Sequence, residues 1–340
     1  MKLIKVVSLS LLTTSLALSS ALVEKVNKNG IIPIPKSELE VLKLIDDPKD
    51  PITKDKVELG KKLYFDPRIS KSGLISCNTC HNLALGGVDG IGAAIGHKWT
   101  ANPHHLNSPT VYNSAFFKAQ FWDGRSPHLA DQAQGPVQAG PEMAAPKELV
   151  EKRINSIAAY VNEFKKTYGD KVKVNFEKIT STIAIFEKTL VTPSRFDDFL
   201  NGNENALTKA EKKGLNTFMD KGCVSCHTGI ALGGTMQPFE LANKYKFAKV
   251  GDFKGNAQGM VKTPTLRNIT ETAPYFHNGA IWSLKEAVQE MGSVQLGINI
   301  SDKEANEIVT FLTSLKGRKP QIIYPQLPQS SEKTPKPSFD

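Results

Sequence analysis

The pattern Cys-x-x-Cys-His occurs twice in this 340-residue chain and restricts its fold more than any other feature. Residues 77–81 read CNTCH and residues 223–227 read CVSCH, and together they contain all four cysteines of the chain. A disulfide within Cys-x-x-Cys closes a very small loop and would add little stability to a chain of this length. Four cysteines confined to two such motifs therefore indicate a role other than a disulfide framework.

The motif is the attachment site of a c-type haem. Its two thiols add to the two vinyl groups of the porphyrin, and the adjacent histidine reaches the iron. Zinc would need four ligands per site, and a thioredoxin-like redox pair would need a βαβ setting. The sequence therefore predicts two covalently bound haem c groups. The attachment residues are Cys77, Cys80, Cys223 and Cys226, and the axial iron ligands are His81 and His227.

The segments around the two motifs repeat in the same order. GKKLYFD precedes the first motif and GLNTFMD the second, whereas NLALGG and TGIALGG follow them. SPTVYN at 108–113 matches TPTLRN at 263–268, and FWDG ending at Gly124 matches FHNG ending at Gly279. The chain is therefore predicted to contain two copies of one module.

Apolar residues at helical spacing predict a mainly α fold with two tandem cytochrome c-like domains, each binding one covalent haem. A Ser301 N-cap with Glu304 three residues later predicts the start of the last helix. The expected helices cover 54–65, 172–191, 208–218, 283–291 and 302–315.

Thr192-Pro193 ends the 172–191 helix and is taken as the boundary between the modules. This division predicts an N-terminal haem domain at 22–192 and a C-terminal haem domain at 193–318. Residues 319–340 are rich in proline, which predicts an extended or disordered tail.

The first 21 residues have the features of a secretory signal. Lys2 and Lys5 precede an apolar run over 6–18, and Ser19-Ser20-Ala21 provides a small-residue cleavage site. An uncleaved membrane anchor is the alternative, although the run is short for a span. The formal charge is +9, with lysines spread along the chain and no arginine-rich arm, which gives a nucleic-acid partner no support.

The sixth iron ligands are predicted from spacing. Met291 follows the second motif on a predicted helix, which favours His/Met coordination and a raised potential for that haem. At the first haem, His97 in AAIGHKW is a candidate bis-histidine ligand, and Met143 competes with it on spacing alone. Unequal potentials would suit chemistry at one haem and electron supply from the other.

Residues 59–316 closely resemble the bacterial di-haem cytochrome c peroxidases. The resemblance is carried by GHKW, NSPTVYN, QFWDGR, DQAQGPV, PEM, TPTLRN, APYFHNGAIWSL and MGSVQLG, all in matching order. It implies reduction of hydrogen peroxide to water with two electrons from a small periplasmic cytochrome c or cupredoxin. Electrons would enter at the C-terminal haem and pass to the N-terminal haem, where peroxide is cleaved.

The resemblance also implies roles for individual residues. His97 would cap the first iron in the resting protein and leave when the second haem is reduced, so Met143 would not be its ligand. Glu142 in PEM would be the acid–base group, and Gln132 would lie with it over the iron. Trp122 would lie between the haems as an electron bridge.

A calcium ion between the domains and a homodimer are implied by the resemblance alone. By motif, Asn107 would offer its side chain to the calcium, and Thr272 and Pro274 would offer their carbonyls. Oxygen ligands of this kind suit calcium. The implied location is the periplasm.

Two other functions remain open from the sequence. A related di-haem oxidase family matures a tryptophan-derived quinone in another protein, but it has tyrosine where Met291 stands and no histidine capping its first haem. A non-catalytic two-haem electron carrier would need neither Glu142 nor Gln132. The residues present favour the peroxidase over both.

Overall fold

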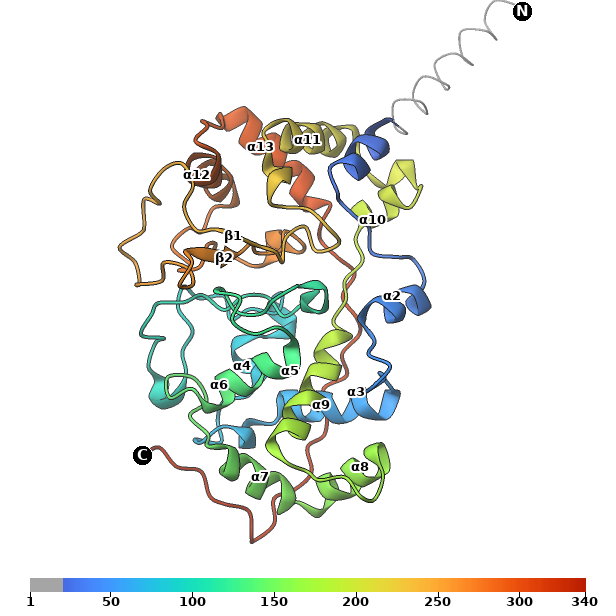
Figure 1. The fold of residues 1–340 in the computed structure, drawn as a ribbon, viewed down its shortest axis with the longest axis vertical. Coiled ribbons are helices and arrows are strands. Elements are labelled where there is room, and N and C mark those ends of the chain that lie inside the picture. The colour runs from blue at the N-terminus through green and yellow to red at the C-terminus, as the bar shows by residue number, and fades with distance from the viewer. Residues whose placement is uncertain (1–20) are drawn as a thin grey trace, which may run out of the picture.

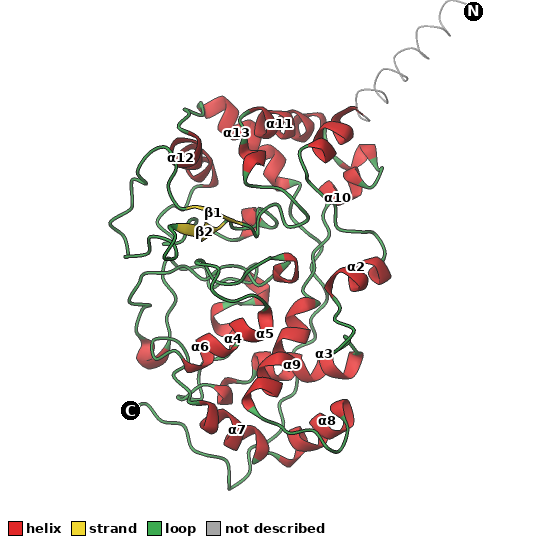
Figure 2. Cartoon of the chain, viewed as in Figure 1, coloured by secondary structure: helices red, strands yellow, loops and turns green. Residues whose placement is uncertain are grey.

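Two helical lobes, one around each CxxCH motif, make up the computed structural model (Figure 1). The structure describes residues 21–340, so the predicted signal at 1–21 lies outside the described residues except for Ala21. The fold is mainly helical, as predicted (Figure 2). Within the described part, the only regular sheet pairs β1 (Met236–Pro238) with β2 (Met260–Lys262) in antiparallel fashion, with Met236 opposite Lys262.

The first lobe contains α3 and α9, which pack together, and several shorter helices around them. Thr53 caps α3 by accepting a hydrogen bond from the Lys56 amide, and Asn175 caps α9 in the same way. The helices from α2 to α9 are α2 (Glu38–Ile45), α3 (Lys54–Phe65), α4 (Cys77–Cys80), α5 (Leu129–Gln132), α6 (Gln134–Gln138), α7 (Lys147–Asn155), α8 (Ala158–Tyr168) and α9 (Phe176–Lys188).

The second lobe is built on the packing of α11 against α13. Thr208 and Glu211 form a capping box at the start of α11, and the predicted capping box of Ser301 and Glu304 is confirmed at the start of α13. The helices of this lobe are α10 (Arg195–Leu200), α11 (Lys209–Asp220), α12 (Leu284–Leu296) and α13 (Asp302–Thr313).

A glycine at equivalent places in the repeat allows the central helices of each lobe to touch. A Cβ on Gly60 would overlap the Thr182 carbonyl oxygen of α9, and a Cβ on Gly214 would overlap the Glu307 carbonyl oxygen of α13. The two helix pairs therefore approach closely enough that only glycine fits at the contact. The first CxxCH motif follows α3 along the chain, and the second follows α11.

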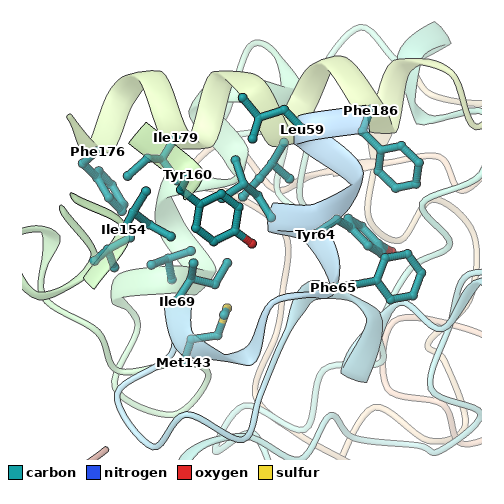
Figure 3. Packing of buried hydrophobic residues seen from close by; sticks show 14 of the residues in the cluster. Leu59, Tyr64, Phe65, Ile69, Met143, Ile154, Tyr160, Phe176, Ile179 and Phe186 are labelled. Carbon is teal, nitrogen blue, oxygen red and sulfur yellow. The ribbon is translucent and has the colours of Figure 1, made fainter. Parts of the chain in front are cut away.

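Each lobe has its own apolar core. In the first lobe, Leu59, Tyr64, Ile154 and Phe186 belong to one cluster, and Met143 is buried in it at 4% exposure (Figure 3). The larger cluster of the second lobe is centred on α11 and α13. It also takes in Leu22, Val26 and Ile31, so the first described residues pack on the second lobe.

The two lobes meet at Thr192, beside the predicted module boundary. Asn113 closes SPTVYN and Asn268 closes TPTLRN, and both have a left-handed backbone, with φ of 61° and 60°. Their side-chain amides donate to the same Thr192 hydroxyl oxygen, at 2.8 Å and 2.9 Å. The equivalent ends of the two repeats therefore share one buried acceptor. The exact division of the chain into domains stays a prediction.

Residues 319–340 have no helix or strand and run back from α13 over the first lobe, shown in red in Figure 1. None of the helices within residues 21–340 combines the length and apolar character that crossing a bilayer requires.

Candidate di-haem site

The first CxxCH motif lies on α4, directly after the loop that leaves α3. The Tyr64 hydroxyl of α3 donates to the His81 carbonyl at 2.6 Å, which fixes the end of the motif. His81 Nδ1 lies 3.0 Å from the Pro109 carbonyl of SPTVYN. Since a carbonyl only accepts, Nδ1 carries the proton and Nε2 is left as the ligand nitrogen. Burial also lowers the pKa of His81, which favours the neutral form that binds metals.

The second motif repeats this arrangement. His227 is buried, and its Nδ1 lies 3.0 Å from the Leu232 carbonyl, so its Nε2 is also the free nitrogen. Burial lowers the pKa of His227 to about 4, which keeps the imidazole neutral at pH 7. In both histidines, the hydrogen bond at Nδ1 and burial of the ring therefore leave a neutral imidazole whose Nε2 can bind a metal.

A cavity lined mostly by the second lobe, and partly by the first, has the residues that a haem requires. Cys223, Cys226, His227 and Met291 all line it, and most of the remaining lining side chains are apolar. Two thiols for the vinyl groups, an imidazole with a free nitrogen and a thioether sulfur form a donor set that fits a covalent His/Met haem. The residues present thus fit the predicted group.

His97 has the features of a ligand without its metal. Its side chain is 6% exposed, and neither ring nitrogen has a hydrogen-bond partner among the described residues. Buried polar groups are rarely left unpaired, so an imidazole in this state fits a site completed by an iron. The loop that carries His97 is strained, because Lys98 and Trp99 have φ of 59° and 56°.

Glu142 lies beside His97 in the first lobe. The Glu142 carbonyl accepts a hydrogen bond from the His97 amide at 2.7 Å, so the PEM and GHKW motifs are adjacent. Burial raises the pKa of the Glu142 carboxyl, and the positive charge of Arg125 opposes this only in part. A carboxyl that takes up a proton more readily than usual is suited to acid–base work.

No hydrogen bond within residues 21–340 connects Gln132 to His97 or Glu142. Gln132 is the last residue of α5 and is half-buried. Its amide donates to the His128 carbonyl, and its side chain has no hydrogen-bond partner within residues 21–340. Met143, the alternative ligand on spacing, packs in the core of the first lobe.

Trp122 lies in the wall between the two lobes. Its indole nitrogen donates to the Asn107 carbonyl at 2.9 Å, and its own carbonyl accepts from the Lys262 amide at 2.7 Å. The Trp122 ring meets the His277 ring edge-on, with centroids 6.5 Å apart. Because Trp122 also lines the cavity that contains His227, it lies beside the second haem site.

Two of the three predicted calcium ligands are in contact. The Asn107 side-chain amide donates to the Pro274 carbonyl at 2.7 Å, and the Asn107 backbone amide donates to the His277 carbonyl at 2.8 Å. Thr272 lines the same cavity as both residues. Turning the Asn107 amide over would direct its oxygen toward this group of carbonyls, a donor set that suits calcium. The calcium site itself stays a prediction.

Sequence reasoning missed Lys262, which lies between the lobes. Its side chain is 4% exposed, stacks over the Phe117 ring at 4.6 Å and lines the cavity of the second lobe. Burial lowers the pKa of Lys262 to about 7, with Asp123 opposing the shift. The repeat contains a signal for this residue, because Lys262 precedes TPTLRN as Asn107 precedes SPTVYN.

Two protein families match this chain, one in each half. The family described as di-haem cytochrome c peroxidase matches residues 54–205, and the cytochrome c family matches residues 211–316. Cytochrome c551 peroxidase of Pseudomonas aeruginosa is 45% identical over 300 residues, which cover 85% of this chain and 86% of that protein. Cytochrome c551 peroxidase of Nitrosomonas europaea is 46% identical over 296 residues, covering 84% and 87%.

Among solved structures, a MauG-like protein associated with microbial copper homeostasis has a similar fold. Its TM-score is 0.68 at 23% sequence identity, and the match covers 84% of this chain and 93% of that one. At this level of identity, the likeness concerns the fold alone.

Proposed function

Because this chain belongs to the di-haem cytochrome c peroxidase family and is a peroxidase enzyme, we propose that it reduces hydrogen peroxide with electrons from a small cytochrome c or cupredoxin. The overall change is one peroxide, two electrons and two protons to two waters. The proposed setting is the periplasm, and the proposed assembly is a homodimer, which light scattering on the holoenzyme tests. When bound, the two haem c groups supply a peroxide-binding iron in the first lobe and an electron-accepting iron in the second.

The observation that carries the proposal is the unpaired His97 imidazole beside Glu142. A buried imidazole with two unbonded nitrogens gives up no protein hydrogen bond when it moves away from a metal. The strained backbone at Lys98 and Trp99 gives its loop a second reason to rearrange. We therefore propose that His97 would be the displaceable ligand of the first iron, with His81 as the ligand that stays.

Glu142 provides the proton chemistry in this proposal. Its raised pKa suits a group that accepts a proton from one peroxide oxygen and returns it to the other as the O–O bond breaks. Gln132 is proposed to orient the peroxide, since its half-buried side chain has no hydrogen-bond partner in the described chain to give up. An electron carrier would need neither group.

The second lobe is proposed to serve the electron donor. His227 and Met291 would hold its iron, and Trp122 would connect the two sites, because it lies in the wall of the same cavity. Asn107, Thr272 and Pro274 would hold one calcium ion where the lobes meet. An ion at that position would fix the lobes, and with them Trp122, whose indole bonds Asn107.

The test is steady-state oxidation of a reduced small cytochrome c by hydrogen peroxide. The enzyme is supplied fully oxidised or pre-reduced by one electron, with calcium or with a chelator. We expect rapid turnover only after pre-reduction and with calcium, since His97 must leave the first iron. His97→Ala is expected to turn over without pre-reduction.

Other outcomes separate the alternatives. Turnover of the oxidised wild-type enzyme would keep the peroxidase and remove the His97 cap. No turnover in either form, with both haems attached and several donors tried, would favour the electron carrier. An unchanged rate after chelation would argue against the calcium site.

A further inference from the structure

Residues 319–340, here called the strap, connect the second lobe to the first. Lys319 pairs with Glu271 of the second lobe at 2.9 Å and lies over the Tyr112 ring of the first lobe at 5.8 Å. Further along, the Tyr324 ring meets the Phe65 ring edge-on, with centroids 4.8 Å apart. The strap then descends past α9 and α3 to the α7 end of the first lobe (Figure 1).

A buried arginine of α7 holds the distal part of the strap. The Arg153 side chain donates to the Pro335 carbonyl at 3.1 Å and to the Lys336 carbonyl at 2.8 Å. Arg153 is 1% exposed, so an unmade hydrogen bond there would be costly. The remaining donors of the same guanidinium bond the carbonyls of Arg68, Ser70 and Lys71. One side chain therefore joins the strap to residues 68–71.

The strap ends against His97. The Ser338 amide donates to the Lys71 carbonyl at 3.1 Å, which sets the direction of the last residues. The Phe339 ring then lies nearly parallel to the His97 ring, at 11°, with centroids 6.5 Å apart. This geometry is within the range of offset aromatic stacking. It is the one ring contact that His97 makes among the described residues.

A second connection runs through the backbone. The Lys71 amide donates to the Met143 carbonyl at 2.8 Å, and the His97 amide donates to the Glu142 carbonyl at 2.7 Å. Since Glu142 and Met143 are neighbours, hydrogen bonds lead from the strap through residue 71 to the His97 loop. The strap thus contacts His97 by its ring and supports the backbone beside it.

We propose that the strap positions His97, with Phe339 as the residue that holds its imidazole in the iron-capping place. The inference rests on the proposed function, in which His97 is the displaceable ligand. The face of the imidazole is held by Phe339, while both ring nitrogens stay free of protein partners. Because the strap starts on the second lobe at Lys319, it also gives that lobe a physical connection to the cap.

The test compares Phe339→Ala with Phe339→Tyr and with Tyr324→Ala in the full-length holoenzyme. Tyr324→Ala is the matched control, because it removes an aromatic contact of the same strap far along the chain from Phe339. The readout is the fraction of enzyme molecules whose first haem is high-spin when the enzyme is fully oxidised, measured by electron paramagnetic resonance. A second readout is hydrogen exchange in peptides covering 94–100.

Phe339→Ala is expected to shift the balance between capped and uncapped iron about threefold to tenfold toward the uncapped form, the usual range for one aromatic pair. Phe339→Tyr and Tyr324→Ala are expected to match the wild type. Exchange at 94–100 should increase only in Phe339→Ala. Equal spectra and exchange in Phe339→Ala and Tyr324→Ala would overturn the proposal.

His97→Ala separates this proposal from the one it rests on. If His97→Ala keeps the low-spin signal of the wild type, His97 is not the ligand and the proposed cap fails. If His97→Ala loses that signal while Phe339→Ala does not change it, only the strap proposal fails. A chain ended after Lys336 lacks Phe339 but retains the Arg153 bonds to the strap. Its spectrum is expected to match that of Phe339→Ala, and a wild-type spectrum would overturn the strap proposal.

Discussion

At the scale of single residues, two charged side chains are buried, Lys262 between the lobes and Glu187 in α9. Lysine and glutamate are usually solvated, so these residue types alone do not predict burial. For Lys262, the place before TPTLRN in the repeat is the one sequence signal, and Glu187 has none. Cys-x-x-Cys-His has few alternative uses, so the sequence identifies both motifs.

Glu187 allows a prediction about pH. Burial raises the pKa of its carboxyl from 4.5 to about 8, and its Oε2 has no hydrogen-bond partner within residues 21–340. The native state therefore binds the proton more tightly than the unfolded chain. Stability from this group is complete below about pH 5 and falls by about 1.4 kcal/mol per pH unit up to about pH 8.

Glu187→Gln should remove that slope, because glutamine does not titrate. We expect the variant to gain stability relative to the wild type at pH 8 but not at pH 5, measured as thermal midpoints of the holoenzyme. Glu177→Gln, on the exposed face of the same helix, is the control. An identical pH dependence in Glu187→Gln and the wild type would contradict the assignment.

At the scale of elements, helical periodicity predicted the main helices and located some of their ends. The 54–65 helix coincides with α3, and the 302–315 helix covers all of α13, which ends two residues earlier at Thr313. The helix predicted over 283–291 continues to Leu296 as α12, because Gly297 with φ of 65° provides the stop. The path of the strap could not be predicted, since it depends on Arg153 bonding backbone carbonyls that no sequence pattern indicates.

The close helix contacts give a prediction at this scale. Gly60→Ala and Gly214→Ala each place a methyl group against a backbone carbonyl of the partner helix. Overpacking typically costs about 1–3 kcal/mol, and the better helix propensity of alanine offsets only part of it. We expect both variants to be destabilised in denaturant unfolding. Lys209→Ala, at the exposed start of α11, should be nearly neutral, and an equal effect would exclude the steric explanation.

At the scale of the whole molecule, the repeat explains how the lobes are joined. Thr192 accepts hydrogen bonds from the closing asparagine of each repeat, Asn113 and Asn268. Both asparagines are at most 1% exposed. The sequence predicted a boundary at Thr192-Pro193 from the end of a helix, but it contained no indication that the threonine would bond both halves.

Thr192→Val tests this junction. Valine has a similar shape but no acceptor, so two buried amide groups would lose their partner. We expect a destabilisation of about 2–6 kcal/mol, from about 1–3 kcal/mol for each of the two unsatisfied groups, measured by urea unfolding. Thr192→Ser retains the hydroxyl and should recover most of the loss. Equal stability of the two variants would show that the shared acceptor is unimportant.

Two backbone hydrogen bonds between the lobes are reciprocal. The amide of Asn107, before SPTVYN, bonds the carbonyl of His277 in FHNG, and the amide of Lys262, before TPTLRN, bonds the carbonyl of Trp122 in FWDG. Reciprocal contacts of this kind define an isologous interface, in which one patch meets a second copy of itself. The lobes therefore face each other as the subunits of a two-fold symmetric dimer do, within one chain. Side chains that differ at equivalent positions, such as Trp122 and His277, are where the chain departs from that symmetry and makes its two halves unequal.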